Sequence, residues 1–384
     1  MKSFRKLPVL ALLSVALLVV SSSAVNATGN TIRVNGASSL ATFLDKCKAS
    51  YATATGDQFS GYTAVGSGGG KTQFGAGTVD IGLSDSENSN SNKPAGMLHI
   101  PFVAWPVTIM YNLNTNKQLN LSTETVAKIF AGQITKWNDP QIVADNNKSY
   151  QVPVYKTKNG EVVKDKNGAP VVLRYKTTRT YFTFPDKKII VVYRNAGSGT
   201  TNNFVTALNK LHPTIWTKPG NDLFSTAFPG SISADPIGFQ GGNNSVAMAT
   251  LAQKTKYSIT YNEFSFAKDY GLGVANIINP AGNSIAPSTE GVLGAFSVAK
   301  FAADGIVTFD YANKLASQYP FSATTYAMVL PKYSSAALAN GVKDFIDYFA
   351  YQCPVVTEGL GFAKTTKTSD LGKIITAQLA KIGS

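Results

Sequence analysis

The sequence has very few of the residues that bind metals or act as strong nucleophiles. Among 384 residues there are two cysteines and two histidines, and no Cys-x-x-Cys motif. His99 and His212 lie in unrelated contexts, so we expect both to be structural or solvated. Zinc sites need clustered Cys or His ligands, and a nucleophilic cysteine needs a neighbouring base. The composition therefore argues against a metal site, a Cys-His enzyme and a bound cofactor.

Long apolar runs are also scarce, and the one that exists lies near the N-terminus. Residues 7–20 are apolar, follow three basic residues and precede small residues at 21–27. This order is typical of an export signal peptide over residues 1–27, cleaved near Ala27. The run is shorter than the roughly 20 residues of a membrane-spanning helix. We expect a periplasmic or secreted protein, with an uncleaved anchor as the alternative.

Charged residues make up only 15% of the chain, and acidic ones are the scarcer kind. When the three basic residues of the signal segment are left out, 32 of the 35 basic residues remain. Against 22 acidic residues this gives a net charge of +10. That surplus attracts anions in general. Lys and Arg are spread along the chain without an aromatic-basic motif, so we expect no nucleic-acid partner. The apolar fraction of 44% is typical of a folded globular protein.

One segment concentrates basic charge. Residues 155–188 carry nine basic and three acidic residues and two Asn-Gly pairs, at 159–160 and 167–168. Asn-Gly flanked by alternating residues is typical of a β-hairpin turn. We predict a surface hairpin here, either a solvated loop or a patch that docks a partner.

The mature chain is long enough for two lobes. About 357 residues remain after cleavage, which is more than one core usually serves. Strands alternate with helices in the first third, and this predicts an α/β fold with parallel-rich sheets. Strands at 107–113 and 324–330 are the predicted crossings between lobes. We therefore predict lobe I from residues 28–110 and 326–384, lobe II from 111–325, and a hinged ligand cleft between them.

Periodicity and capping signals predict the individual elements. Besides the two crossings, the predicted strands are residues 31–34, 62–65, 79–83, 189–193 and 257–261. The predicted helices are a short one from Gly68, one that the 194–201 segment opens and that runs through Leu211, and residues 40–54, 122–131, 243–255, 290–303, 335–351 and 371–382. In such folds ligands bind beyond the carboxyl ends of the strands.

Cys47 lies on the first predicted helix, and Cys353 follows the helix at 335–351. Both belong to lobe I in the predicted division. Export to an oxidising compartment permits a disulfide between them. Because disulfide geometry cannot be read from sequence, a bonded pair and two free thiols both remain open.

The most informative motif lies between the strand at 189–193 and the helix that follows it. It reads Arg-Asn-Ala-Gly-Ser-Gly-Thr-Thr, from Arg194 to Thr201. A guanidinium, hydroxyls and free backbone N–H groups at a helix N-terminus form an oxyanion site without a metal. The same order of strand, small residues and helix occurs at residues 36–39 and 66–70. Together the three motifs predict a pocket for a small tetrahedral anion.

These motifs, in this order, resemble the periplasmic phosphate-binding proteins of high-affinity phosphate ABC transporters. The resemblance also includes Thr-Val-Asp-Ile-Gly-Leu-Ser-Asp at 78–85, Ile-Phe-Ala-Gly-Gln-Ile-Thr-Lys-Trp-Asn-Asp at 129–139 and Tyr-Ser-Ile-Thr-Tyr at 257–261. It covers nearly the whole mature chain. It implies a type II periplasmic-binding-protein fold and a monomer that captures inorganic phosphate and delivers it to membrane permease subunits. It implies no catalytic activity.

The resemblance also implies a set of phosphate-binding residues. Asp85 falls where the family has a carboxylate that accepts the proton of hydrogen phosphate, and Arg194 where it has a charged fork. Hydroxyl and backbone donors would come from Ser38, Ser39, Ser67, Ser198, Gly199 and Thr200. Two positions depart from the family: Ala196 replaces a common acidic residue, and Ser39 replaces an aromatic one.

Other functions fit parts of the pattern. A secreted phosphatase or serine hydrolase would use Ser198 or Ser67, but it needs a base, and both histidines are misplaced for that. Another oxyanion, such as sulfate or molybdate, would give Asp85 no proton to accept. A secreted interaction protein could keep the fold and use the basic hairpin. Phosphate binding is the interpretation that uses every motif.

Overall fold

The fold is given by a computed structural model that describes residues 29–91 and 93–383. The predicted signal peptide and its cleavage site lie outside the described residues. The helices are α1 (Ala41–Thr55), α2 (Gly66–Gly75), α3 (Thr123–Phe130), α4 (Pro140–Asn146), α5 (Gly199–Leu211), α6 (Phe224–Ala227), α7 (Ser245–Lys254), α8 (Ser265–Asp269), α9 (Thr289–Phe296), α10 (Ala336–Tyr351), α11 (Cys353–Val356), α12 (Asp370–Leu379) and the 3-10 helices η1 (Ser38–Leu40) and η2 (Ile232–Ala234).

Among the described residues the strands are mostly short, and the longest has 14 residues. They are β1 (Thr31–Ile32), β2 (Val34–Gly36), β3 (Gln58–Phe59), β4 (Ile81–Ser84), β5 (Leu98–Tyr111), β6 (Asn120–Ser122), β7 (Ser149–Tyr155), β8 (Thr157–Lys158), β9 (Glu161–Val162), β10 (Val172–Arg179), β11 (Ile190–Arg194), β12 (Phe239–Gly242), β13 (Ser258–Glu263), β14 (Gly273–Val274), β15 (Asn276–Ile278), β16 (Ser284–Ile285), β17 (Lys300–Phe301), β18 (Val307–Thr308) and β19 (Ser322–Val329).

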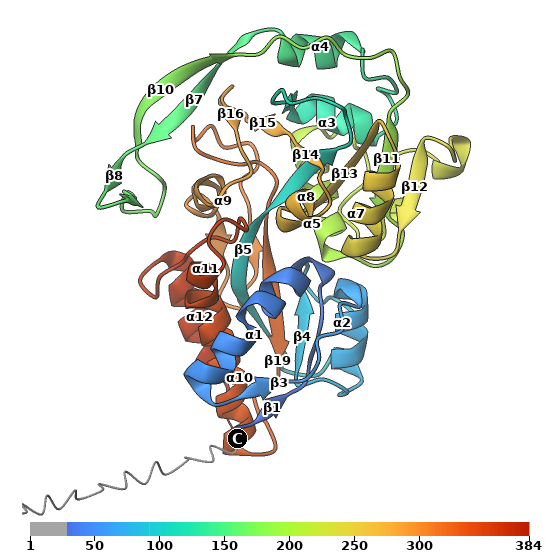
Figure 1. The fold of residues 1–384 in the computed structure, drawn as a ribbon. Helices are drawn as coiled ribbons and strands as arrows, with labels where there is room; N and C mark the ends of the chain where they lie inside the picture. The colour runs from blue at the N-terminus through green and yellow to red at the C-terminus, as the bar shows by residue number, and fades with distance from the viewer. Residues whose placement is uncertain (1–28, 92, 384) are drawn as a thin grey trace, which may run out of the picture.

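The long central strands β5 and β19 join two lobes that lie one above the other in Figure 1. One curled sheet runs through both lobes in the order β12-β11-β13-β5-β19-β4-β2, with β14 also paired to β5. The lower part of β5 pairs with β19, and its upper part, from Val107 to Tyr111, pairs with β13. β5 therefore pairs with strands of both lobes and connects the two halves of the sheet.

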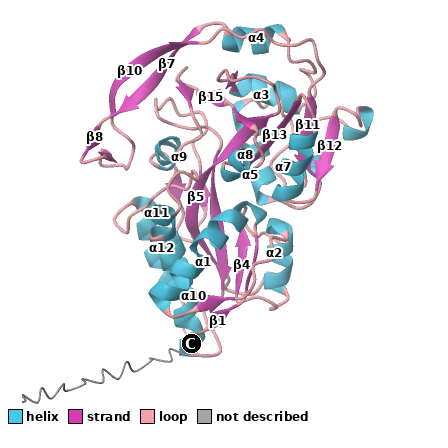
Figure 2. Ribbon diagram, viewed as in Figure 1, coloured by secondary structure: helices cyan, strands magenta, loops and turns pink. Residues whose placement is uncertain are grey.

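Lobe I is the part of the molecule built around β2, β4 and the lower ends of β5 and β19. β2 and β4 are parallel, and β19 is antiparallel to both β4 and β5. Helix α2 packs on β2 and β4, while α10 and α12 pack on β5. Figure 2 shows these helices on either side of the strands. Core residues of these strands, such as Val34, Ile81 and Ile100, have no exposed surface.

Lobe II is built around β11, β12 and β13. β11 lies between its two neighbours and is parallel to both, whereas β13 is antiparallel to β5. α7 packs on β11, β12 and β13, and α5 contacts α3 and α6. Its aromatic core includes Phe204 stacked on Tyr261, with ring centroids 4.6 Å apart. The carboxyl end of β11 and the first turn of α5 thereby face lobe I.

The two-lobe α/β architecture predicted from sequence is confirmed, and two predicted elements are wrong. Residues 62–65 form an isolated bridge from Thr63 to Asn35, because the chain turns there to enter α2. Helix α9 ends at Phe296, not at 303, because the chain that follows forms the β17–β18 hairpin around Gly305. β5 also begins nine residues before the predicted strand, since a fully buried strand shows no alternation. The lobe boundaries at 110 and 325 stay a prediction.

The basic segment forms a protruding arm. β7 and β10 are an antiparallel ribbon that carries the small β8–β9 hairpin, and it extends to the left of Figure 1. Asn159 and Gly160 both have positive φ angles, 53° and 83°, as a tight hairpin turn requires. The arm begins at Ser149, six residues before the predicted start. Its tip and the C-terminal part of the chain, around Lys364, line a cavity of about 130 Å³.

No helix within residues 29–91 and 93–383 combines the length and the apolar character needed to cross a membrane.

Candidate functional site: a polar cluster between the lobes

Four chain turns meet where the two lobes touch. Lobe I contributes η1 after β2, the start of α2, and the residue that follows β4. Lobe II contributes the turn from β11 into α5. Three of these turns follow the carboxyl ends of strands, where α/β sheets bind their ligands. The eight predicted site residues lie on these turns. Hydrogen bonds join Ser39, Ser67 and Thr200 to Asp85, and another joins Ser38 to Arg194.

Asp85 is the buried carboxylate at the centre of this cluster. Thr325 donates to its Oδ1 at 2.7 Å, and Thr200 donates to its Oδ2 at 2.8 Å. The Ser39 hydroxyl lies within 3.0 Å of both oxygens. The backbone N–H of Asp85 donates to Ser67 Oγ at 3.1 Å. Thr200 belongs to lobe II, so this carboxylate holds a direct contact across the cleft.

Arg194 is the buried cation of the cluster, with only 2% of its surface exposed. Its Nε donates to the Asn243 carbonyl at 2.8 Å, and its Nη1 donates to Ser38 Oγ at 3.2 Å. Its Nη2 is fully buried and has no hydrogen-bond partner among the described residues. An unpaired guanidinium N–H in a dry site is costly and indicates that the site accepts an anion.

Glycine allows the backbone to approach these charged groups. Gly66 has a positive φ of 85°, and a Cβ there would collide with Arg194 Nη2. A Cβ at Gly199 would collide with the backbone of Asp85 and Ser86. Any larger residue would therefore force the two lobes apart or displace the guanidinium. The close approach of these groups therefore requires glycine at the starts of α2 and α5.

The serines of the cluster are placed differently from one another. Ser38 and Ser245 share a hydroxyl hydrogen bond of 2.9 Å across the lobes, and the Ser245 N–H also donates to Ser38 Oγ at 3.2 Å. Ser198 Oγ caps α5 by accepting from Thr201 N at 3.2 Å. The Ser198 N–H donates to the Asp222 carbonyl at 2.9 Å, so only its hydroxyl proton is free for a ligand.

Burial shifts the pKa of Asp85 and that of Arg194 in the directions that favour the neutral form of each group. Burial raises the pKa of Asp85, although the hydroxyls of Thr325, Thr200 and Ser39 and the charge of Arg194 oppose the shift. Burial lowers the pKa of Arg194, against the opposing effects of Tyr261 and Asp85. Each group therefore lacks enough counter-charge in its dry surroundings. A bound anion that carries a proton would supply both: negative charge for Arg194 and a proton for Asp85.

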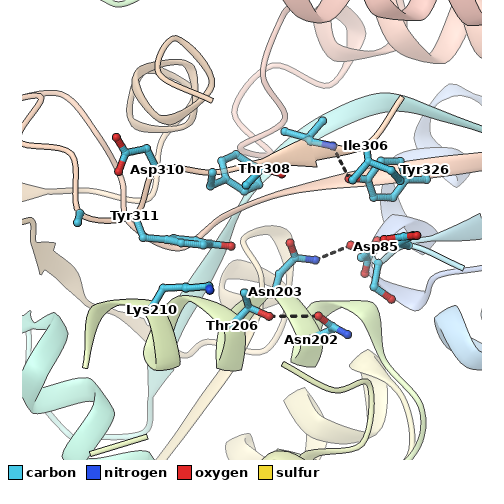
Figure 3. Close-up of a pocket in the computed structure, with 15 residues that line it drawn as sticks. Asp85, Asn202, Asn203, Thr206, Lys210, Ile306, Thr308, Asp310, Tyr311 and Tyr326 are labelled. Atoms are coloured by element: carbon cyan, nitrogen blue, oxygen red, sulfur yellow. Dashed lines mark hydrogen bonds between the residues drawn. The ribbon is translucent and has the colours of Figure 1, made fainter. Parts of the chain in front are cut away.

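A groove of about 420 Å³ leads from solvent to this cluster. Figure 3 shows it between helix α5, which presents Asn203, Thr206 and Lys210, and the segment around Tyr311. Asp85 closes its inner end, where the Asn203 amide donates to the Asp85 carbonyl. Arg194 does not line this groove, because the lobes are in direct contact around the guanidinium. The structure is thus a closed form of the two lobes.

The remaining reactive residues are committed elsewhere. His99 Nε2 accepts from the Asn88 N–H at 2.9 Å, and burial lowers the pKa of His99 to about 4. His212 Nε2 lies 2.9 Å from the Thr123 hydroxyl. Cys47 and Cys353 form a disulfide inside lobe I. Among the described residues, no group of three or more His, Cys, Asp or Glu side chains could hold a metal ion.

Sequence reasoning missed three members of the cluster. Thr325 lies in the middle of β19, where no local signal distinguishes it from other buried strand residues. Asn203 lies in the interior of α5, where its side chain also resembles an ordinary helix residue. Ser245 could have been found, because it starts α7 after Gly-Gly-Asn-Asn and so repeats the order of strand, small residues and helix.

Comparison with known proteins agrees with this architecture. A family model described as a PBP superfamily domain matches residues 21–352. The phosphate-binding protein PstS of Pasteurella multocida is 30% identical over 349 residues, covering 90% of this chain and 89% of the relative. The PstS of Haemophilus influenzae is 31% identical over 329 residues, covering 84% and 85%. The solved structure of a human phosphate binding apolipoprotein shares the fold, at 20% identity and a TM-score of 0.64, covering 91% of this chain and 93% of that chain.

The fold, the inter-lobe cluster and the extent of these matches place the chain in the PBP superfamily of two-lobe binding proteins. Within that superfamily it belongs to the PstS family of phosphate-binding proteins.

Proposed function

We propose that this protein captures inorganic phosphate between its two lobes and delivers it to the permease subunits of an ABC transporter. The observation that carries the proposal is Arg194 Nη2, a buried guanidinium N–H without a partner among the described residues. Both relatives compared above are named phosphate-binding proteins, which supports phosphate as the anion. The protein acts outside the cytoplasm, after signal-peptide cleavage near Ala27.

The proposed ligand-binding residues are those of the cluster. Arg194 would bind phosphate oxygens through Nη2, and Asp85 would accept the proton of hydrogen phosphate. Hydroxyl and backbone donors would come from Ser38, Ser39, Ser67, Ser198, Gly199 and Thr200. In the closed form several of these hydroxyls bond to one another, so phosphate exchanges protein–protein hydrogen bonds for protein–ligand ones. Charge-assisted bonds to a phosphate oxygen are stronger than the neutral bonds they replace.

Calorimetric titration of the full-length mature protein with phosphate, arsenate and sulfate tests this proposal. We expect phosphate and its close analogue arsenate to bind with one site each, and sulfate to bind far more weakly. Arsenate carries a proton at neutral pH as phosphate does, so it separates recognition of the proton from recognition of the element. Equal affinity for sulfate and phosphate would show that the site selects only charge and shape.

A phosphatase remains the second candidate because the cluster holds several serines. Ser67 Oγ accepts the Asp85 N–H, and Ser198 Oγ accepts the Thr201 N–H. A serine nucleophile needs a base within hydrogen-bond reach, and His99 and His212 are bonded to other groups. We therefore propose a binding protein and not a hydrolase. Release of phosphate from a chromogenic phosphate ester, abolished by Ser67→Ala or Ser198→Ala, would reverse this choice.

A further inference from the structure

One ion pair links the two lobes beside the proposed anion site. Lys71 on α2 of lobe I and Asp222, between α5 and α6 of lobe II, are 2.7 Å apart from Nζ to Oδ2. Of the ion pairs among the described residues, this is the one that joins the lobes. Its side chains are 6% and 21% exposed, whereas every other pair has at least one side chain more than 28% exposed.

Two further side chains complete this contact, which we call the inter-lobe clasp: Lys71, Ser86, Asn202 and Asp222. Lys71 Nζ also donates to Ser86 Oγ at 2.8 Å, and Ser86 Oγ donates to Asp222 Oδ1 at 2.8 Å. The Asn202 amide donates to the same Oδ1 at 2.9 Å. Both oxygens of Asp222 therefore have partners: Oδ2 the Lys71 ammonium, and Oδ1 the Ser86 hydroxyl and the Asn202 amide. The bonds to Lys71 and Ser86 cross from one lobe to the other, so they exist only while the lobes are closed.

The inter-lobe clasp adjoins the proposed ligand residues on both lobes. Ser86 follows Asp85 directly, so the clasp holds the turn that carries the central carboxylate. On lobe II the Asp222 carbonyl accepts the Ser198 N–H at 2.9 Å, which ties the clasp to the first turn of α5. Asn202 lies in the same turn. None of the clasp side chains hydrogen-bonds to the Arg194 guanidinium, which donates to Asn243 and Ser38.

We propose that Lys71 and Asp222 are positioning residues that stabilise the closed form and so set the affinity for the anion without touching it. The proposal rests on the proposed function for the identity of the ligand, and on the structure alone for the closure. In the open form both charges can be hydrated, so their pairing contributes only to the closed form. Removing one charge leaves the other buried and unpaired in the closed form, which shifts the equilibrium toward opening.

The variants Asp222→Asn, Lys71→Met and the double variant test this, with Asp186→Asn as the matched control. Asp186 pairs with Lys136 at 2.8 Å within lobe II, and both side chains are more than half exposed. We expect each single variant at the clasp to weaken phosphate binding by about 10- to 100-fold. The double variant should bind no more weakly than either single variant, because the second change removes an already unpaired charge. The control should bind within about twofold of wild type.

Two readouts separate positioning from simple loss of stability. Stopped-flow binding should show the loss mainly as a faster phosphate dissociation rate, with the association rate within about threefold of wild type. Asp222→Glu, which keeps the charge, should recover most of the affinity that Asp222→Asn loses. If Asp222→Asn binds phosphate as tightly as the Asp186→Asn control, the proposal is overturned.

Small-angle X-ray scattering without phosphate keeps the two proposals distinguishable. Asp222→Asn should have a larger radius of gyration than both wild type and Asp186→Asn, since the closed form loses population. If wild type does not bind phosphate, the proposed function is wrong. The scattering comparison then still tests whether the inter-lobe clasp stabilises the closed form. Identical radii for all three proteins in that case would reject it.

Discussion

At the scale of single residues, Arg194 is where charge and burial conflict most directly. Its guanidinium has 2% exposure, bonds only to neutral oxygens, and leaves Nη2 without a partner among the described residues. We predict that Arg194→Ala weakens phosphate binding by roughly 2–5 kcal/mol, the cost of truncating one partner of a buried charged contact. Calorimetry measures this, with the exposed arm variant Arg174→Ala as the control. Unchanged phosphate affinity in a normally folded Arg194→Ala protein would contradict the role of Arg194 in binding phosphate.

Asp85 governs selectivity through the proton of the ligand. A buried carboxylate beside a fully ionised anion repels it, whereas hydrogen phosphate offers a proton to share. An unpaired buried charge costs several kcal/mol, enough for roughly a thousandfold discrimination against sulfate. We predict that Asp85→Asn narrows the ratio of phosphate to sulfate affinity more than it changes phosphate affinity itself. Competition titrations on both proteins measure the ratio, and a constant ratio would remove Asp85 from this role.

Glu263 makes the stability of the protein depend on pH. It lies fully buried at the end of β13, accepts hydrogen bonds from Ser265, and burial raises its pKa from 4.5 to about 8. Between pH 4.5 and about pH 8, Glu263 is therefore protonated in the folded state and ionised in the unfolded state. It follows that stability falls as pH rises from about 4.5 to about 8.

We predict that Glu263→Gln removes this loss because it cannot ionise. The variant should resemble wild type in urea unfolding at pH 5 and exceed its stability by a few kcal/mol at pH 9, since each pKa unit corresponds to about 1.4 kcal/mol. Asp269→Asn serves as a comparison, because the Asp269 charge is one of the smaller contributions to the raised pKa of Glu263. We expect this variant to keep most of the dependence of stability on pH. A constant difference between variant and wild type across this pH range would contradict the prediction.

At the scale of elements, the disulfide ties the first helix of lobe I to one of its last. Cys47 on α1 and Cys353 at the start of α11 are buried and separated by 306 residues. Closing so long a loop restricts the unfolded chain and stabilises by about 5–6 kcal/mol in the chain-entropy model. We predict that Cys47→Ser/Cys353→Ser lowers the free energy of unfolding by several kcal/mol. Urea denaturation measures it, and reductant should destabilise wild type but leave the double variant unaffected.

Elements with local signals were predicted well from the sequence. The helices predicted at residues 122–131 and after Arg194 are α3 and α5, and Ser122 and Ser198 cap them by accepting from the N–H groups of Thr125 and Thr201. The Asn-Gly pair at 159–160 forms the predicted turn between β8 and β9. The end of α9 was predicted wrongly, because pairing of β17 with β18 overrides the apolar pattern there. Prediction from local sequence is correct where the stabilising contacts lie within a few residues of each other. It is wrong where pairing with a more distant segment competes.

At the scale of the whole molecule, ligand binding and lobe closure should be one event. Asp85 and Thr200 meet across the lobes at 2.8 Å, and so do Ser38 and Ser245 at 2.9 Å. A ligand that binds only the folded protein stabilises it by about 2.7 kcal/mol at a hundred times its Kd. We predict that phosphate at this level raises the melting temperature by roughly 4 °C. Sulfate at equal ionic strength should give a clearly smaller shift, and so should phosphate added to Arg194→Ala.

The sequence by itself determined the two-lobe α/β class and the order of the motifs, and it indicated eight residues that lie at the turns between the lobes; their contact with phosphate stays a prediction. These follow from periodicity, caps and small-residue turns, and from a family resemblance that spans the chain. Only the tertiary structure decided which residues meet across the cleft. Thr325 reaches Asp85 over 240 positions, Ser38 reaches Ser245 over 207, and Lys71 reaches Asp222 over 151. No pattern within a few residues encodes such pairs, because their energy arises only when the two lobes close on each other.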